Sequence, residues 1–265
     1  MSNFQERQAI RDSWGNDQDL PRGTRVIFLL GHVGNESSPL QINVTKESEI
    51  HGDILQEDFI DSYANLTVKS LMLLKWFSQS CYNQVPYVLK TDDDVYINLK
   101  NLHRVASLNK KNKLLLGTLI CGATPIRDPY NKWFAPKYMY AKKRYPNYLS
   151  GTAYLMSKSV ASLLYQNSVK NSVKMPVFHM EDIFITGIVA QYSGIRPQDH
   201  VGFSYVKRRY TPCLYSQIIS SHHLSMDEMK DIHKKVKAKE GKCAPIKKKF
   251  LRSYGPGRCI WSPPK

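Results

Sequence analysis

Three consecutive aspartates, Asp92, Asp93 and Asp94, interrupt the stretch YVLKTDDDVYINL (87–99), and the runs on both sides of them have the apolar character of buried β-structure. Adjacent like charges repel one another, and burial of an unpaired carboxylate is costly or shifts its pKa. A strand that ends in this cluster needs a compensating cation. Mg²⁺ and Mn²⁺ take carboxylate oxygens as ligands and commonly bridge to substrate phosphates. The cluster therefore predicts a metal–diphosphate site at a strand end, with an acidic surface turn as the alternative.

Strand-like and helix-like segments alternate along the chain. Strands show as short apolar, β-branched runs and helices as apolar residues at helical spacing. We expect strands at 24–31, 53–63, 86–91, 114–120 and 152–156, and helices at 44–51, 65–81, 98–113, after Ser157 and at 181–194. This alternation predicts an α/β sheet whose functional site lies at the carboxyl ends of its strands.

The chain has 265 residues with 42% hydrophobic content, which is enough for a substantial core, and a formal net charge of +16. Much of the positive charge lies in DIHKKVKAKEGK (231–242) and IKKKFLR (246–252). A nucleic-acid surface would interleave aromatic residues with the basic ones, or would show a known binding module. This tail has neither, so we expect a solvated helix face and a basic tail, and no nucleic-acid partner.

The cysteines and the acceptor motifs for N-glycosylation bear on the compartment. The chain has 5 cysteines and no CxxC pair, which argues against a zinc ribbon or a redox motif. Asn-Xaa-Ser/Thr triplets begin at Asn35, Asn43 and Asn65, as in secreted or lumenal proteins. No apolar run approaches the roughly 18 residues that span a membrane, and the first residues lack the apolar core of a signal peptide.

Seven blocks follow one another along the chain. They are RQAIRDSWG (7–15), DFIDSYANLTVKSLMLLKW (58–76), YVLKTDDDVYIN (87–98), PIRDPYNKWF (125–134), RYPNYLSGTAYLMS (144–157), EDIFITGIV (181–189) and SHHLSMDEM (221–229). In this order they resemble the β-1,3-galactosyltransferases and β-1,3-N-acetylglucosaminyltransferases of glycosyltransferase family 31. The resemblance covers roughly residues 7–243 and implies a GT-A fold, a Rossmann-like mixed sheet flanked by helices. It also implies a UDP-sugar donor, a Mn²⁺ cofactor and inversion at the anomeric carbon.

The resemblance assigns roles to the acidic cluster and to a pair of histidines. By position, Asp94 would be the direct metal ligand, Asp92 would contact the ribose, and Asp93 would belong to the donor site. His222 aligns with a histidine that completes the metal shell in relatives, and His223 beside it is the rival. The metal would neutralise charge that builds up on the departing UDP.

The resemblance also places the acceptor site. A nucleotide sugar is α-linked, so a β product requires one in-line displacement and one general base. Asp182 would be this base, and Glu181 would orient the acceptor sugar, together with Tyr148 and Gly151. The alternative for the two acids is a structural one, because acidic residues favour helix N-termini.

Three cations, Arg11, Lys69 and Lys90, lie in blocks of the family pattern. We expect them to contact the donor, for example its phosphates or uracil. Salt bridges to neighbouring acidic residues are the alternative.

The chain departs from the family pattern at both ends. Relatives have an apolar strand just before the first block, and before it a cytoplasmic tail, a membrane anchor and a stem. Here only six residues precede that block. We therefore expect an N-terminally truncated catalytic domain at 1–243, with loss of its first strand as an alternative, and a disordered basic extension at 244–265. We also predict a disulfide between Cys213 and Cys243, which both lie in the C-terminal part of the family region.

Within the family resemblance, the sequence patterns NKWF and YPxYxSGTxYxxS favour transfer of galactose from UDP-galactose to the 3-hydroxyl of an acceptor sugar on a glycoprotein or glycolipid. Transfer of N-acetylglucosamine from UDP-GlcNAc is the alternative. A further alternative is an inactive carbohydrate-binding relative, against which the intact acidic cluster, Asp182 and His222 argue. The resemblance implies that the full-length protein is a type II membrane protein of the Golgi lumen, held to the membrane through an anchor that this chain lacks.

Overall fold

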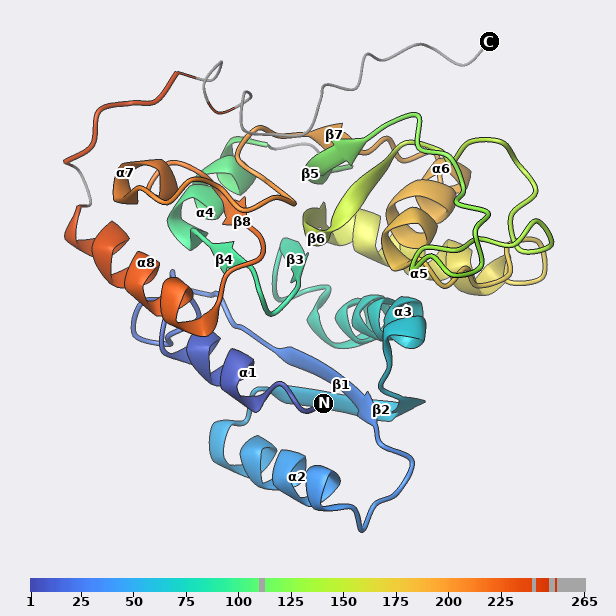
Figure 1. The fold of residues 1–265 in the computed structure, drawn as a ribbon, viewed down its shortest axis with the longest axis horizontal. Helices are drawn as coiled ribbons and strands as arrows, with labels where there is room; N and C mark the ends of the chain where they lie inside the picture. Colours follow the sequence, from blue (N-terminus) through green and yellow to red (C-terminus); the bar gives the residue numbers. More distant parts are fainter. Residues whose placement is uncertain (110–112, 240–241, 248–250, 252–265) are drawn as a thin grey trace.

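The computed structural model describes residues 1–109, 113–239, 242–247 and 251 (Figure 1). The strands are β1 (Phe28–His32), β2 (Ile54–Ile60), β3 (Tyr87–Thr91), β4 (Tyr96–Ile97), β5 (Leu115–Ile120), β6 (Tyr148–Ser157), β7 (Gln198–Asp199) and β8 (Ser220–Ser221). The α-helices are α1 (Phe4–Arg11), α2 (Pro39–His51), α3 (Leu66–Trp76), α4 (Leu99–Leu108), α5 (Lys158–Lys170), α6 (Ala190–Tyr192), α7 (Pro212–Tyr215) and α8 (Met226–Ala238). A 3₁₀ turn, η1 (Tyr63–Asn65), and two π-helical segments, η2 (Phe77–Cys81) and η3 (Ile183–Val189), complete the fold.

The strands form three hydrogen-bonded groups. The largest has the order β3-β6-β5-β7, in which β6 is antiparallel to both β3 and β5 and β7 is parallel to β5. Strands β1 and β2 form a parallel pair, and the short β4 and β8 form an antiparallel pair. Helices surround these strands (Figure 1). The predicted mixed α/β architecture is confirmed.

Strand β6 separates two hydrophobic cores. Successive side chains of a strand point to opposite faces. Ala153 and Leu155 pack in the core that also holds β4, α7 and α8, whereas Tyr154 and Met156 pack in the core that holds α5 and η3. In α/β folds, functional sites commonly lie in the loops at the ends of such central strands, which have helices on both sides.

The five predicted strands and the five predicted helices are present, with different bounds. Strand β6 begins four residues before the predicted 152–156, because Tyr148 and Leu149 pair with β5 beyond a register shift. The helix predicted at 181–194 is mostly π-helical, and it stops at Gly194, which has a positive φ of 64°. No helix in the described part of the chain is long and apolar enough to cross a membrane.

The C-terminal region confirms one prediction. Cys213 and Cys243 form a disulfide with a Cα–Cα distance of 5.4 Å, which joins α7 to the segment after α8. Ile246 packs against the core near α8, and the carbonyl of the buried Leu251 accepts a hydrogen bond of 2.9 Å from Arg208. The rest of the extension predicted at 244–265, apart from residues 244–247 and 251, lies outside the described residues, and the boundary at 243 stays a prediction.

Candidate active site

The three aspartates form the turn between β3 and β4. The last residue of β3 is Thr91, and the Asp92 N–H still donates to the Thr152 carbonyl of β6 at 3.1 Å. Strand β4 then pairs with β8, which is followed directly by the two histidines. This short pairing brings together residues from 94 and from 222–223, which lie far apart in the sequence.

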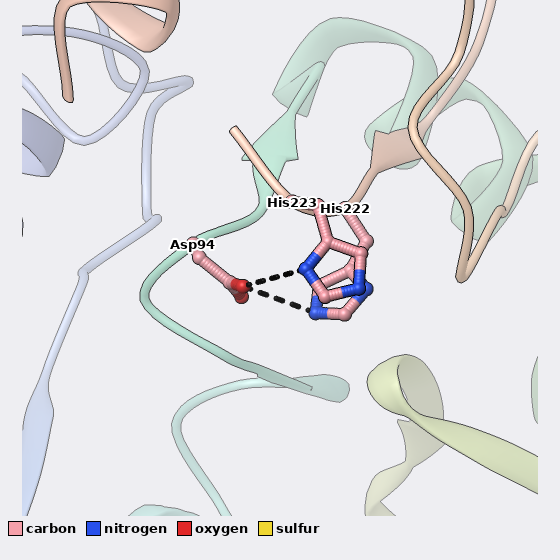
Figure 2. A group of neighbouring side chains, drawn as sticks. All are labelled: Asp94, His222 and His223. Carbon is pink, nitrogen blue, oxygen red and sulfur yellow. Dashed lines mark ion pairs between the residues drawn. The ribbon is translucent and has the colours of Figure 1, made fainter. Parts of the chain in front are cut away.

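Asp94, His222 and His223 form a compact group of possible metal ligands (Figure 2). The Nε2 atom of His222 lies 3.1 Å and the Nδ1 atom of His223 lies 3.6 Å from Oδ2 of Asp94. The two imidazole rings stack with centroids 3.7 Å apart. His223 has a φ of 60°, a value that L-residues other than glycine rarely adopt and that often marks functional sites. Both rivals for the histidine role therefore lie beside Asp94.

The electrostatics of this group are mutually reinforcing. Burial raises the pKa of Asp94, but the hydrogen bond and the charge of His222 outweigh it and leave the pKa below its usual value. Burial lowers the pKa of His222, but the hydrogen bond and charge of Asp94 and the contact with the Tyr205 carbonyl together outweigh it, so the pKa is raised. The other ring nitrogen, Nδ1, lies 2.9 Å from the Tyr205 carbonyl. Donation from Nδ1 leaves the lone pair of the neutral ring on Nε2, which faces Asp94, as in metal-binding histidines.

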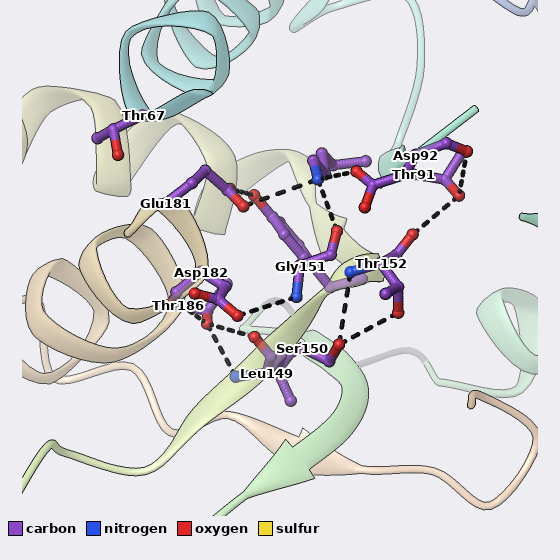
Figure 3. Close-up of polar contacts among 12 residues, drawn as sticks. Thr67, Thr91, Asp92, Leu149, Ser150, Gly151, Thr152, Glu181, Asp182 and Thr186 are labelled. Carbon is purple, nitrogen blue, oxygen red and sulfur yellow. Dashed lines mark hydrogen bonds and ion pairs between the residues drawn. The ribbon is translucent and has the colours of Figure 1, made fainter. Parts of the chain in front are cut away.

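Asp182 lies at the N-terminal end of η3, against β6 (Figure 3). Its Oδ1 atom accepts a hydrogen bond from the Ile183 N–H at 2.8 Å, and its Oδ2 atom accepts one from the Gly151 N–H at 3.3 Å. Burial, with the adjacent charge of Glu181, raises the pKa of Asp182 to about 6. A carboxylate with such a pKa is ionised at neutral pH and is more basic than an ordinary aspartate, as a general base should be.

Lys90 connects the two acidic motifs. Its Nζ atom lies 2.5 Å from Oδ1 of Asp92, 2.6 Å from the Gly151 carbonyl and 3.7 Å from Oε2 of Glu181. Burial lowers the pKa of Lys90, but the charges of Asp92 and Glu181 outweigh it, so the pKa is raised and the side chain remains a cation. One half-buried ammonium group thus holds together the end of β3, the middle of β6 and the start of the segment that leads into η3.

The other predicted site residues have mixed positions. Asp92 is partly exposed, with 41% of its side-chain surface accessible, and can reach a ligand. Asp93 accepts a hydrogen bond of 2.7 Å from the Asn3 side chain, next to α1. Tyr148 lies close enough to Asp182 that this charge, after burial, helps to raise its pKa.

Two of the predicted donor-site cations are engaged by acidic residues elsewhere. Arg11 donates to Asp53 at 2.7 Å and to Glu47 at 2.8 Å. Lys69 donates to Asp61 at 2.8 Å. These contacts belong to the region of α1, α2 and the β1–β2 pair, and they match the salt bridges that were the alternative interpretation of the sequence.

The sequence interpretation missed Tyr154. Its hydroxyl donates to Oε1 of Glu181 at 2.5 Å, inside the protein. In the sequence, Tyr154 belongs to an apolar strand and is indistinguishable from a core aromatic. The only available signal was chemical, because a buried tyrosine hydroxyl usually has a hydrogen-bond partner.

The chain is similar to several known glycosyltransferases. The Galactosyltransferase family matches residues 5–201. Beta-1,3-galactosyltransferase 1 of Homo sapiens is 37% identical over 242 residues, which are 89% of this chain and 71% of that protein. Beta-1,3-galactosyltransferase 5 of Homo sapiens is 33% identical over 91% of this chain and 77% of that protein.

A relative with a different named donor sugar is also similar. Lactosylceramide 1,3-N-acetyl-beta-D-glucosaminyltransferase A of Danio rerio is 36% identical over 83% of this chain and 59% of that protein. The family match and the extent of these similarities agree with the resemblance carried by the seven sequence blocks. The chain is therefore a member of the galactosyltransferase family of glycosyltransferases.

Proposed function

We propose that this chain transfers galactose from UDP-galactose to the 3-hydroxyl of an acceptor sugar, with inversion, to form a β-1,3 linkage. The names of two relatives support galactose, and the name of the third keeps N-acetylglucosamine from UDP-GlcNAc as the alternative. The observation that carries the proposal is the Lys90 contact set, because it joins the acidic cluster of a donor site to the acidic pair of an acceptor site.

The donor set of Asp94 and His222 fits Mn²⁺. The ligand atoms of this pair and of His223 all lie within 4.8 Å of one another, and carboxylate oxygen and imidazole nitrogen are both ligands that such a cation accepts. The second ring nitrogen of His222 is already held by a carbonyl, as metal-binding histidines require. A bound Mn²⁺ would stabilise negative charge on the UDP leaving group.

Asp182 would act as the general base. The oxygen of the acceptor 3-hydroxyl forms a bond to the anomeric carbon, while the bond from that carbon to the β-phosphate oxygen of UDP breaks. The hydroxyl proton passes to the Asp182 carboxylate, whose raised pKa of about 6 makes it a better proton acceptor than an ordinary aspartate. The N–H groups of Ile183 and Gly151 hold this carboxylate in place.

The remaining assignments follow the two halves of the site. Asp92 and Asp93, with Lys90, would serve the donor side. Arg11 and Lys69, which pair with Glu47, Asp53 and Asp61, would contribute to that side from the α1 and α3 region only by exchanging these salt bridges for the donor. Tyr148, Gly151 and Glu181 would form the acceptor side. We place the catalytic domain at 1–243, with a basic extension after it. We also propose that the full-length protein acts on glycoproteins or glycolipids in the Golgi lumen.

The test is a transfer assay with purified protein, UDP-galactose or UDP-GlcNAc, and a panel of acceptor sugars, with and without Mn²⁺. We expect Mn²⁺-dependent transfer with a preference for UDP-galactose. Asp94→Ala should abolish Mn²⁺-dependent UDP binding in calorimetry, because it removes the carboxylate ligand and leaves β3 and β4 intact. A matched control is Asp17→Ala, at an exposed aspartate.

Three outcomes would contradict parts of the proposal. Preference for UDP-GlcNAc would select the alternative donor. Sugar binding without transfer or donor hydrolysis would indicate an inactive carbohydrate-binding protein. Unchanged affinity for UDP–Mn²⁺ in a folded Asp94→Ala protein would remove Asp94 from the metal site.

A further inference from the structure

Glu181 is buried, and each of its carboxylate oxygens has a polar neighbour inside the protein. Only 6% of its surface is accessible. Its Oε1 atom accepts the hydrogen bond from the Tyr154 hydroxyl, and its Oε2 atom faces Lys90 at 3.7 Å (Figure 3). A carboxylate in this position has little capacity left for a direct contact with an acceptor sugar. It can still act on the neighbouring Asp182 through its charge and position.

We propose that Tyr154 is a positioning residue for Asp182, and that it acts by holding Glu181 against Lys90. Glu181 would then orient the acceptor indirectly, because it fixes the base rather than the sugar. This inference rests on the proposed function of Asp182 as the general base.

The Tyr154 hydroxyl is itself held in place. Tyr154 is 1% exposed, and its ring packs in the core that contains α5 and η3. Ser70 of α3 is close enough to influence the pKa of this hydroxyl. The hydroxyl therefore lies where β6, α3 and the segment before η3 meet, and the neighbouring atoms leave it little freedom to move. Its loss would leave Oε1 of the buried Glu181 without its hydrogen-bond donor, which is costly inside a protein.

The position of Glu181 affects that of Asp182 through Gly151, against which both side chains pack. A Cβ atom at Gly151 would lie 3.1 Å from Oε2 of Glu181 and 3.3 Å from Cβ of Asp182, so both acids pack directly on this glycine. The Gly151 N–H donates to Asp182, and the Gly151 carbonyl accepts from Lys90. A displacement of Glu181 or Lys90 would therefore move the backbone group that holds the base.

The same groups set the charge around Asp182. The charge of Glu181 raises the pKa of Asp182, and that of Lys90 lowers it. The other titratable groups that face Asp182 are the phenols of Tyr145, Tyr148 and Tyr154, each with a pKa raised above its ordinary value and therefore neutral at physiological pH. Among the described residues named as acting on the pKa of Asp182, Glu181 supplies a negative charge and Lys90 a positive one.

The test compares Tyr154→Phe with wild type and with Tyr87→Phe. Both substitutions remove one hydroxyl from a strand tyrosine; the Tyr87 hydroxyl donates to the Asn109 carbonyl and does not contact the acidic pair. We expect Tyr154→Phe to lower kcat by at least about tenfold, because the base is no longer fixed in reach of the acceptor. The KM for the UDP-sugar and the calorimetric affinity for UDP–Mn²⁺ should stay within about twofold of wild type. Tyr87→Phe should keep wild-type kcat.

A second variant, Glu181→Gln, tests the inference through the pH dependence of kcat. This test remains available if the Tyr154→Phe protein does not fold. Removal of the Glu181 charge lowers the pKa of Asp182, so the acidic limb of the kcat profile should move to lower pH. Wild-type kcat in folded Tyr154→Phe, or an unmoved acidic limb in Glu181→Gln, overturns the inference while transfer by the wild type still supports the proposed function. Absence of transfer by the wild type with every donor and acceptor overturns both.

Discussion

At the scale of single residues, the proposed role of Asp182 brings two conflicting requirements, since a general base must be ionised to act and this side chain is half-buried. Its pKa of about 6 lies above the ordinary value of 3.8, so the folded protein holds the proton more tightly than the unfolded chain does. Between these two values the folded state therefore loses stability as pH rises. Above about pH 6 the protein bears the full cost of a desolvated carboxylate, which is the condition under which the proposed base would work.

The substitution Asp182→Asn should separate catalysis from stability. Turnover should fall by about 10²–10⁴-fold, as is typical for loss of a general base, while affinity for the UDP-sugar and the metal is retained. The thermal midpoint at pH 7.5 should equal or exceed that of wild type, since the cost of the buried charge is removed. Below about pH 4 the advantage should vanish, because Asp182 is then protonated in both the folded and unfolded states.

Transfer rates at saturating donor and acceptor, with thermal midpoints at both pH values, check this prediction. Wild-type turnover in Asp182→Asn would show that the base lies elsewhere. If Asp182→Asn lowers the thermal midpoint below that of wild type, and does so more at pH 7.5 than at pH 4, then Asp182 stabilises the fold as a helix cap.

The residues of the proposed metal group and of the acidic pair could be proposed from the sequence because each stands in a distinctive block. Asp94 and His222 were paired by their places in those blocks, and they lie 3.1 Å apart. Arg11 and Lys69 stand in similar blocks, yet their charges are taken up by Glu47, Asp53 and Asp61. Sequence shows that a cation is present, but which acidic residues surround it depends on the packing of α1, α2 and β2.

At the scale of elements, the interface of β6 with η3 sets the distance between Asp182, the proposed base, and Tyr148 and Gly151 of the proposed acceptor side. The helix over this region was predictable, because its apolar residues are continuous and Gly194 stops it. Its π-helical hydrogen bonding was not, since apolar spacing does not distinguish i+4 from i+5 bonding over so few residues. The first part of β6, residues 148–151, was also missed, because Ser150 and Gly151 resemble a loop when the pairing of this segment with β5 is unknown.

Substitution of Gly187 tests this interface. A Cβ atom there would lie 3.0 Å from Cβ of Tyr148 and 3.3 Å from Pro146, so Gly187→Ala should push η3 away from β6. We expect the free energy of unfolding to fall by about 1–3 kcal/mol, as for overpacked cores. The KM for the acceptor should rise above its wild-type value by a larger factor than the KM for the donor. Thermal denaturation and acceptor titrations measure the two effects.

Gly194→Ala is the matched control at the other end of the segment. Gly194 has a φ of 64° and no neighbour within 4 Å of the added methyl group, so the cost there is backbone strain alone. It should lower the thermal midpoint without changing either KM. An unchanged acceptor KM in Gly187→Ala would mean that the β6–η3 spacing does not shape the acceptor side.

At the scale of the whole molecule, the candidate site is assembled from segments that are distant in the sequence. The acidic turn after β3, the middle of β6, the start of η3 and the histidines after β8 meet around Lys90 and Asp94. The β4–β8 pairing, which brings the two histidines to the acidic turn, has only two residues in each strand. Such short strands have no pattern of their own, so their pairing could not be predicted from periodicity and forms only because the surrounding core is in place.

The Cys213–Cys243 disulfide should support this assembly from outside the site. It closes a loop with a sequence separation of 30, and that loop contains β8, both histidines and α8. In the chain-entropy view, closing a loop of this length stabilises the folded state by about 3–4 kcal/mol. Cys213→Ser combined with Cys243→Ser should therefore lower the thermal midpoint and weaken Mn²⁺ binding, because the segment that carries His222 is less constrained. Cys81→Ser, at a cysteine that is a free thiol, is the control and should leave Mn²⁺ affinity unchanged. Calorimetric titration of Mn²⁺ in the presence of UDP decides the case: equal affinity in the double variant and in wild type would show that β4–β8 pairing and the core hold His222 without the disulfide.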